Sequence, residues 1–167
     1  MSKGMQPIFT QRVPSGTSGI TFNNIPQTYD DLLLKLSIRG TATSWDSIGI
    51  IFNSNQYDRS RNVIQGNGSA ASTSTGTYRD FGAMGGTNTT ANAYSSFDIY
   101  IPNYTKAFFH QCIINGVTEN NATEAYCYLA SFIDLNNFPI TKLGISSSTY
   151  GLSLGAESTM TLYGIGQ

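Results

Sequence analysis

The segment 31–40, DLLLKLSIRG, constrains the fold of this chain more than any other part of the sequence. Leucine or isoleucine occupies every even position from 32 to 38, and polar side chains occupy every odd position except 33. Because successive side chains of a β-strand point to opposite faces, this period of two predicts a strand with one buried face. Leu33 breaks the alternation, and we expect it to meet a flanking loop or a neighbouring subunit.

Further short runs with strand character lie between clusters of Gly, Pro, Asn and Ser, which are typical turn residues. About eight or nine such strands indicate an all-β fold, an antiparallel β-sandwich that is jelly-roll-like. No helix longer than a turn or two is predicted. The further predicted strands are 7–13, 19–25, 47–53, 96–101, 106–115, 124–133, 140–146 and 158–165.

The length of 167 residues fits one domain. We predict a single β-sandwich over residues 13–167, preceded by residues 1–12 as an N-terminal arm or a first edge strand. Residues 66–93 are rich in Gly, Ser and Thr and predict one long polar loop, within which the run YRDFGAM (78–84) could form a short strand or an anchor. Such loops are uncommon in compact domains and are usually functional or mobile. The loop is therefore either a contact segment or a solvent-exposed insertion.

The distribution of charged and apolar residues limits which classes of partner the chain could bind. Charged residues make up 11% of the chain and the net charge is −1, with the nine basic residues scattered rather than clustered. A phosphate-binding surface needs clustered Lys and Arg, so we predict no nucleic acid partner. No apolar run reaches the roughly 20 residues needed to cross a bilayer, so we predict no membrane partner. The first residues lack the apolar centre of a signal peptide, which favours a cytoplasmic origin.

The two cysteines, Cys112 and Cys127, are too few for a disulfide framework. If the strands that contain the two cysteines form a hairpin in which 112 faces 127, the two thiols could form a disulfide bridge. The alternative, which a cytoplasmic origin favours, is two buried thiols that act as small hydrophobic side chains.

Catalytic chemistry needs convergent titratable groups, and the sequence offers few. His110 is the only histidine and lies beside two phenylalanines, so we expect a packed or surface side chain rather than a general base. No zinc-ligand spacing, nucleophile elbow, phosphate loop or dinucleotide motif is present. No spacing selects two acidic residues for glycoside hydrolysis. We therefore predict that the chain is not an enzyme and has no catalytic residues, metal ligands or cofactor.

Aromatic side chains supply the candidate interaction residues. Trp45 lies in a turn outside any alternating face, where it could stack on a sugar ring or enter a protein pocket. The alternative is that Trp45 closes one end of the sandwich core. The predicted interaction surface consists of Trp45, Tyr57, Tyr78, Arg79 and Phe81.

Two stretches resemble a known class of proteins. Residues 20–29, ITFNNIPQTY, continue into the alternating segment 31–40, and residues 158–165, STMTLYGI, close the chain. Both resemble the opening and closing strands of small structural proteins of tailed bacteriophages, which serve as capsid decoration (cement) proteins or as head domains of tail-fibre proteins. The resemblance covers roughly a fifth of the chain. It implies a jelly-roll-like sandwich, a place on the virion and homotrimers, and it names no catalytic residues.

The leading hypothesis is a virion structural protein, assembled in the host cytoplasm, that decorates the capsid. By binding the major capsid protein or other virion proteins only in the assembled lattice, it would stabilise the head by mass action. The first alternative is a tail or fibre-tip module that binds a host glycan or surface receptor through the aromatic candidates. The second is a free carbohydrate-binding module.

Overall fold

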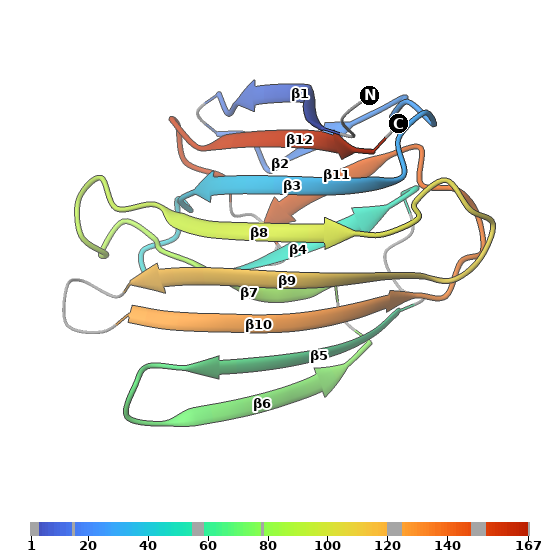
Figure 1. The fold of residues 1–167 in the computed structure, drawn as a ribbon. Coiled ribbons are helices and arrows are strands. Elements are labelled where there is room, and N and C mark those ends of the chain that lie inside the picture. The colour runs from blue at the N-terminus through green and yellow to red at the C-terminus, as the bar shows by residue number, and fades with distance from the viewer. Residues whose placement is uncertain are drawn as a thin grey trace.

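The structure is a computed structural model that describes residues 4–14, 16–54, 59–77, 79–119, 125–147 and 153–166. These residues form twelve β-strands in two antiparallel sheets (Figure 1), which confirms the predicted all-β sandwich. No helix occurs in the described ranges, and hence none that is long and apolar enough to cross a membrane. The strands outnumber the predicted eight or nine because some are too polar to show an alternating pattern.

The larger sheet contains eight strands in the order β1-β12-β3-β8-β9-β10-β5-β6, and the smaller sheet contains four in the order β2-β11-β4-β7. The strands of the larger sheet are β1 (Met5–Arg12), β3 (Asp31–Ile38), β5 (Arg59–Gly66), β6 (Ala71–Gly76), β8 (Ser95–Ile101), β9 (His110–Glu119), β10 (Ala125–Asp134) and β12 (Thr159–Ile165). Those of the smaller sheet are β2 (Gly19–Phe22), β4 (Asp46–Phe52), β7 (Asp80–Met84) and β11 (Leu143–Ser147).

Most connections along the chain pass from one sheet to the other. The exceptions are the hairpins β5–β6 and β9–β10 and the link from β8 to β9, which stay within the larger sheet. The strand β7 ends the smaller sheet and packs against β9, β10 and β5. The larger sheet therefore extends past the smaller one at β5 and β6 (Figure 1).

One hydrophobic core lies between the sheets. The even positions of β3, from Leu32 to Ile38, are almost completely buried, as the alternation predicts. Phe81 of β7 packs edge-on against Phe97 and Phe132 of the larger sheet, with ring centroids 5.3 and 6.4 Å apart. Such edge-to-face pairs add to the stabilisation from buried area. These rings hold the edge of the smaller sheet against the middle of the larger one.

The two segments that carry the sequence resemblance lie side by side. Strand β12 pairs with β3 along its whole length, so that Leu162 faces Leu34. The ring of Tyr29, just before β3, covers Gly164 so closely that a Cβ atom there would lie 2.3 Å from the ring. The amide of Asp30 donates to the carbonyl of Ile165 at 3.0 Å. These residues therefore contact each other within the fold.

The prediction of one long polar loop over residues 66–93 is wrong. The segment contains β6 and β7, joined to β5 by a turn in which the Asn67 carboxamide oxygen accepts hydrogen bonds from the amides of Ser69 and Ala70. Among the described strands, β6, with the sequence ASTSTG, pairs only with β5, and it exposes nearly all of its side chains. An edge strand with no buried face shows no apolar alternation, so the sequence pattern missed it.

The predicted hairpin of the two cysteines is present but its register differs. Cys112 faces Phe132 and Cys127 faces Val117, so the two thiols lie on opposite faces of the sheet and cannot form a bridge. Cys112 is buried and Cys127 is exposed, so the expectation of two buried thiols holds only for Cys112. The register is set by the inward alternation of the whole strand, which two residues alone do not reveal.

The remaining local predictions concern the first residues and Leu33. Residues 5–12 form β1, an edge strand that pairs with β12. Leu33 is half-buried on the outer face of the larger sheet, between Tyr100 of β8 and Tyr163 of β12. Neighbouring strands of its own sheet therefore flank it, and contact with a neighbouring subunit stays a prediction.

We predict that Gly164→Ala destabilises the protein by about 2 kcal/mol, because overpacking a filled site forces a neighbouring ring to move. Gly144→Ala in β11 is the matched control, since a Cβ atom there would lie 3.4 Å from its nearest neighbour, an ordinary contact. Guanidinium-induced unfolding of the two variants measures the difference. Equal stabilities would contradict the packing of Tyr29 on Gly164.

Candidate functional site

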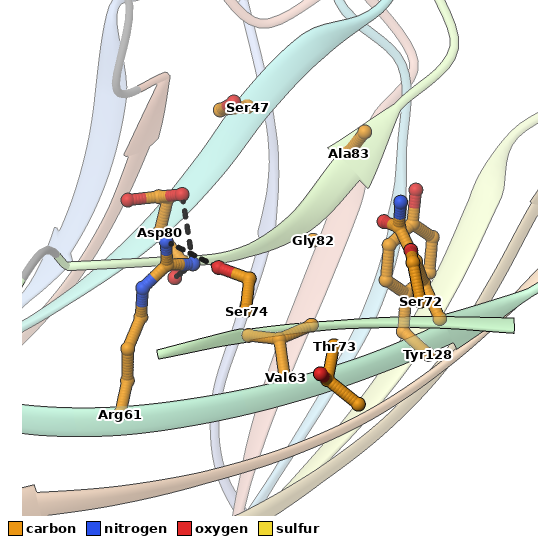
Figure 2. Close-up of a pocket in the computed structure, with 11 residues that line it drawn as sticks. Ser47, Arg61, Val63, Ser72, Thr73, Ser74, Asp80, Gly82, Ala83 and Tyr128 are labelled. Carbon is orange, nitrogen blue, oxygen red and sulfur yellow. Dashed lines mark hydrogen bonds and ion pairs between the residues drawn. The ribbon is translucent and has the colours of Figure 1, made fainter. Parts of the chain in front are cut away.

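A cleft lies where the larger sheet extends past the smaller one, between the β5–β6 hairpin and the edge strand β7. Its volume is about 250 Å³ (Figure 2). Most of its lining side chains are polar, and hydroxyl groups are the most frequent. The lining residues are Ser47, Arg61, Val63, Gln65, Ser72, Thr73, Ser74, Asp80, Gly82, Ala83 and Tyr128.

An ion pair between Arg61 and Asp80 closes one end of the cleft. Nη1 of Arg61 lies 3.0 Å from Oδ2 of Asp80 and donates to the Asp80 carbonyl at 2.7 Å, while Nη2 donates to Oγ of Ser74 at 3.2 Å (Figure 2). These contacts connect β5, β6 and β7. Because the two charges neutralise each other, the cleft presents no net charge to an incoming ligand.

Tyr128 forms the other end of the cleft. Its side chain is 5% exposed, and this burial, together with the nearby Tyr126, raises the pKa of its phenol to about 12, although a backbone hydrogen bond with Ala83 opposes the shift. The phenol therefore stays protonated across the physiological range. The ring lies 6.0 Å from that of Phe97, so it belongs to both the core and the cleft wall.

Two further aromatic side chains lie beside this end of the cleft. Trp45 packs edge-on against Tyr126, with ring centroids 4.6 Å apart and an interplanar angle of 82°. They precede the cleft residues Ser47 and Tyr128 by two positions each. The cleft therefore offers hydroxyl and amide groups and a neutralised ion pair next to aromatic rings. Such a lining suits a neutral ligand that carries several hydroxyl groups.

The structure describes three of the five predicted interaction residues, and it does not bring these three together. Trp45 is half-buried against Tyr126. Arg79 instead donates a hydrogen bond of 3.2 Å to the carbonyl of Ser147 in β11 of the smaller sheet. Phe81 is completely buried, so its assignment to an interaction surface is wrong. Its place on the buried face of β7, a strand inside the segment predicted as a long loop, explains the error. Tyr57 and Tyr78 lie outside the described residues.

His110 is buried at the start of β9, as a packed side chain, and its Nε2 atom lies 2.8 Å from the carbonyl oxygen of Phe138. Within the ranges given above, no three His, Cys, Asp or Glu side chains are grouped so that they would hold a metal ion.

A second surface, which the sequence analysis missed, covers the middle of the larger sheet on the side turned away from the smaller sheet. Six large apolar side chains on β5, β8, β9 and β10 are each between 37% and 52% exposed there. We name this surface the outer apolar face. It consists of Ile64, Tyr100, Ile113, Val117, Leu129 and Ile133.

A third surface lies at the end of the sandwich where β9 begins and β10 ends. His110 is buried there and stands opposite Asp134 in the strand register of β9 and β10. Four apolar side chains from the adjoining loops lie around it, and each is between 46% and 65% exposed. The ring of Phe108 lies 5.6 Å from that of His110. We name this surface the aromatic loop cluster, and it consists of Phe108, Phe109, Leu135 and Phe138.

A signal for both apolar surfaces exists in the sequence. The runs CIINGV in β9 and YLASFIDL in and after β10 place apolar residues on both faces of each strand. An antiparallel sheet with one solvated face normally shows apolar residues on one side only, so apolar residues on both sides indicate a covered face.

Comparisons of the chain with protein-family models, with curated proteins and with solved structures found no match. The cleft and the two apolar surfaces are therefore the basis for a functional proposal.

We predict that Tyr128→Phe makes the protein less sensitive to alkali. The folded state keeps the Tyr128 proton up to its pKa of about 12, whereas the unfolded state releases it near the ordinary value of 10.0. The stability that this proton contributes is complete below pH 10 and is lost as the pH rises from 10 to 12.

The melting temperatures of the wild-type protein and Tyr128→Phe at pH 9 and pH 11.5 test this. The wild-type protein should lose more stability between the two pH values than the variant. An equal loss would show that the Tyr128 phenol is not shielded from water.

Proposed function

We propose that this chain is a structural protein of a tailed-phage virion, a capsid decoration protein that stabilises the assembled head by binding other virion proteins. The observation that carries the proposal is the extent of exposed apolar surface. The outer apolar face and the aromatic loop cluster together hold ten large apolar side chains that are at least 37% exposed.

The protein carries two exposed apolar surfaces rather than one. At roughly 200 Å² for a fully exposed side chain, the outer apolar face presents on the order of 500 Å² of apolar area and the aromatic loop cluster roughly 400 Å². The largest apolar patch on a typical monomer is about 300–600 Å² and is often functional, because such patches mark sites of protein or membrane contact. Since the centre of the outer apolar face is bordered by uncharged amides and hydroxyls, we assign it to protein contact.

The aromatic loop cluster is suited to anchoring on a capsid protein. Phe109 and Phe138 are 55% and 65% exposed and project from the end of the sandwich rather than from its flat face. Aromatic side chains that enter a pocket of a partner supply a large part of the binding energy in many interfaces. A decoration protein anchored in this way would stabilise only the assembled lattice that forms the pocket.

The fold supports the same class. Without the hairpins β5–β6 and β9–β10, the strand order is β1-β12-β3-β8 in one sheet and β2-β11-β4-β7 in the other. This order supports the part of the proposal that assigns the sandwich to the jelly rolls, a topology that occurs in viral capsid proteins. The pairing of β3 with β12 also joins the two segments that resemble phage structural proteins.

We predict that the double variant Phe109→Ser/Phe138→Ser binds the heads of its phage at least tenfold more weakly than the wild-type protein. Both side chains are largely exposed, so the fold should be kept. Met5→Ser is the matched control, since Met5 is 48% exposed on β1 at the far edge of the sheet.

Co-sedimentation with purified, expanded heads measures the binding. Wild-type protein that remains in the supernatant would contradict the proposed function. Equal binding by the double variant and Met5→Ser would exclude the aromatic loop cluster as the anchor.

A second candidate function, recognition of a host glycan, is favoured by one observation, the polar cleft. Its ion pair leaves no net charge, and hydroxyl groups of Ser72 and Ser74 line it next to the ring of Tyr128. These groups suit the hydroxyls and apolar face of a sugar ring. In a tail or fibre-tip module, such a cleft would face the host surface.

If this candidate function is correct, neutral monosaccharides should give saturation-transfer NMR signals with the wild-type protein. Ser72→Ala/Ser74→Ala should weaken the binding about fivefold or more, because each lost hydrogen bond contributes about 1 kcal/mol. Thr75→Ala is the control, since Thr75 lies on the same strand, faces Asn62 and does not line the cleft. The absence of any signal from the wild-type protein would exclude this function.

A further inference from the structure

We propose that a second copy of this chain docks on the outer apolar face, so that strands β5, β8, β9 and β10 of two copies pack face to face in a two-fold dimer. This inference deepens the proposed function, on which it rests, by naming the partner of one of the two apolar surfaces. The outer apolar face is the side of the larger sheet turned toward the viewer in Figure 1.

The arrangement of side chains on this face is complementary to itself. Ile113 of β9 stands opposite Ser131 of β10, and Leu129 of β10 stands opposite Asn115 of β9. Between β9 and β10, each large apolar side chain therefore has a smaller or polar neighbour, which produces alternating projections and hollows across the two central strands. Ile64 of β5 stands beside Leu129, and Tyr100 of β8 stands beside Ile113, so each widens a projection. When two sheets pack about 10 Å apart, projections of one sheet fill hollows of the other.

The charges on this face allow two identical surfaces to meet. The outward side chains from Gln111 to Val117 on β9 and from Cys127 to Ile133 on β10 are all uncharged. Their amide and hydroxyl groups both donate and accept hydrogen bonds, so they can pair with the same groups of another copy. Like charges facing each other would oppose such a contact.

The charged groups around this centre have partners within the chain. Lys35 of β3 donates to both carboxylate oxygens of Asp98 of β8, at 2.9 and 2.8 Å. Asp31 accepts a hydrogen bond from the hydroxyl of Tyr100 at 2.7 Å, and Glu119 accepts one from the hydroxyl of Thr90 at 3.0 Å. A second copy would therefore not have to supply charges that this face lacks.

The area of the outer apolar face matches one side of a stable interface. A standard interface buries about 800 Å² on each partner, of which somewhat more than half is apolar, or roughly 450 Å². Six side chains that are each about half exposed present on the order of 500 Å². One contiguous surface shared by two copies gives a closed two-fold dimer, whereas a trimer around a three-fold axis needs two different surfaces on each copy.

Analytical ultracentrifugation at micromolar concentration tests the inference. We expect the wild-type protein to have twice the monomer mass of 18.1 kDa. Ile113→Ser/Leu129→Ser should raise the dissociation constant of the dimer at least tenfold while the circular dichroism spectrum is kept. The control is Phe109→Ser/Phe138→Ser, which removes apolar side chains of the aromatic loop cluster and should leave the dimer intact.

Alkylation of the wild-type protein is a second test that does not depend on a variant folding. Cys127 is exposed on the same face of β10 as Leu129, whereas Cys112 is buried in the core and serves as an internal control. Modification of Cys127 by iodoacetamide should slow as the protein concentration rises, while that of Cys112 should stay slow throughout. Independence of Cys127 alkylation from concentration would contradict the dimer.

The outcomes separate the two proposals. A dimer that dissociates on substitution of Ile113 but does not bind phage heads would support the dimer and contradict the proposed function. A monomer whose binding to heads is lost on the same substitution would overturn the dimer and assign the outer apolar face to another virion protein. A mass of 18.1 kDa, or of three times that value, would also overturn the two-fold dimer.

Discussion

Insertion of the last two strands between earlier ones is the constraint on which the rest of the structure depends. Strand β12 lies between β1 and β3, and β11 lies between β2 and β4, so in each sheet a strand from the end of the chain joins the first strand to the others. Ordering the chain over such distances has an entropic cost, which burial of residues such as Leu34, Leu162 and Ile145 offsets. The contact of Tyr29 with Gly164 belongs to this closure, because it fixes the turn before β3 against the last strand.

The class of fold could be predicted from the sequence because each core strand has its own alternating pattern. The period of two places the even positions of β3 on the buried face, where the structure has them. Strand β6 could not be predicted in this way, since Ser and Thr side chains on an exposed edge carry no apolar signal. The cysteine register failed for a different reason: pairing depends on the packing of the whole sheet rather than on the two residues considered.

The candidate site was less predictable than the fold because interaction residues follow from exposure, which a single sequence shows only indirectly. Phe81 lies in a segment with few apolar residues but is part of the core, whereas Phe138 lies in no pattern that marks an interaction residue and is 65% exposed. The polar cleft depends on how far β5 and β6 extend past β7, a property of sheet topology. Apolar residues on both faces of β9 and β10 were the one direct sequence signal.

The two edge strands of the larger sheet, β1 and β6, differ in how readily a further strand could pair with them. Strand β1 contains Pro7, which has no amide hydrogen, and its register with β12 shifts between Pro7 and Phe9. Strand β6, at the other edge, is a regular run of small residues without proline or charge, and within the described part of the chain no strand pairs with its outer side. Proline, bulges and charges are common means of protecting an edge against added strands. An extended segment from another molecule could therefore prolong the sheet beyond β6, while β1 would resist such growth.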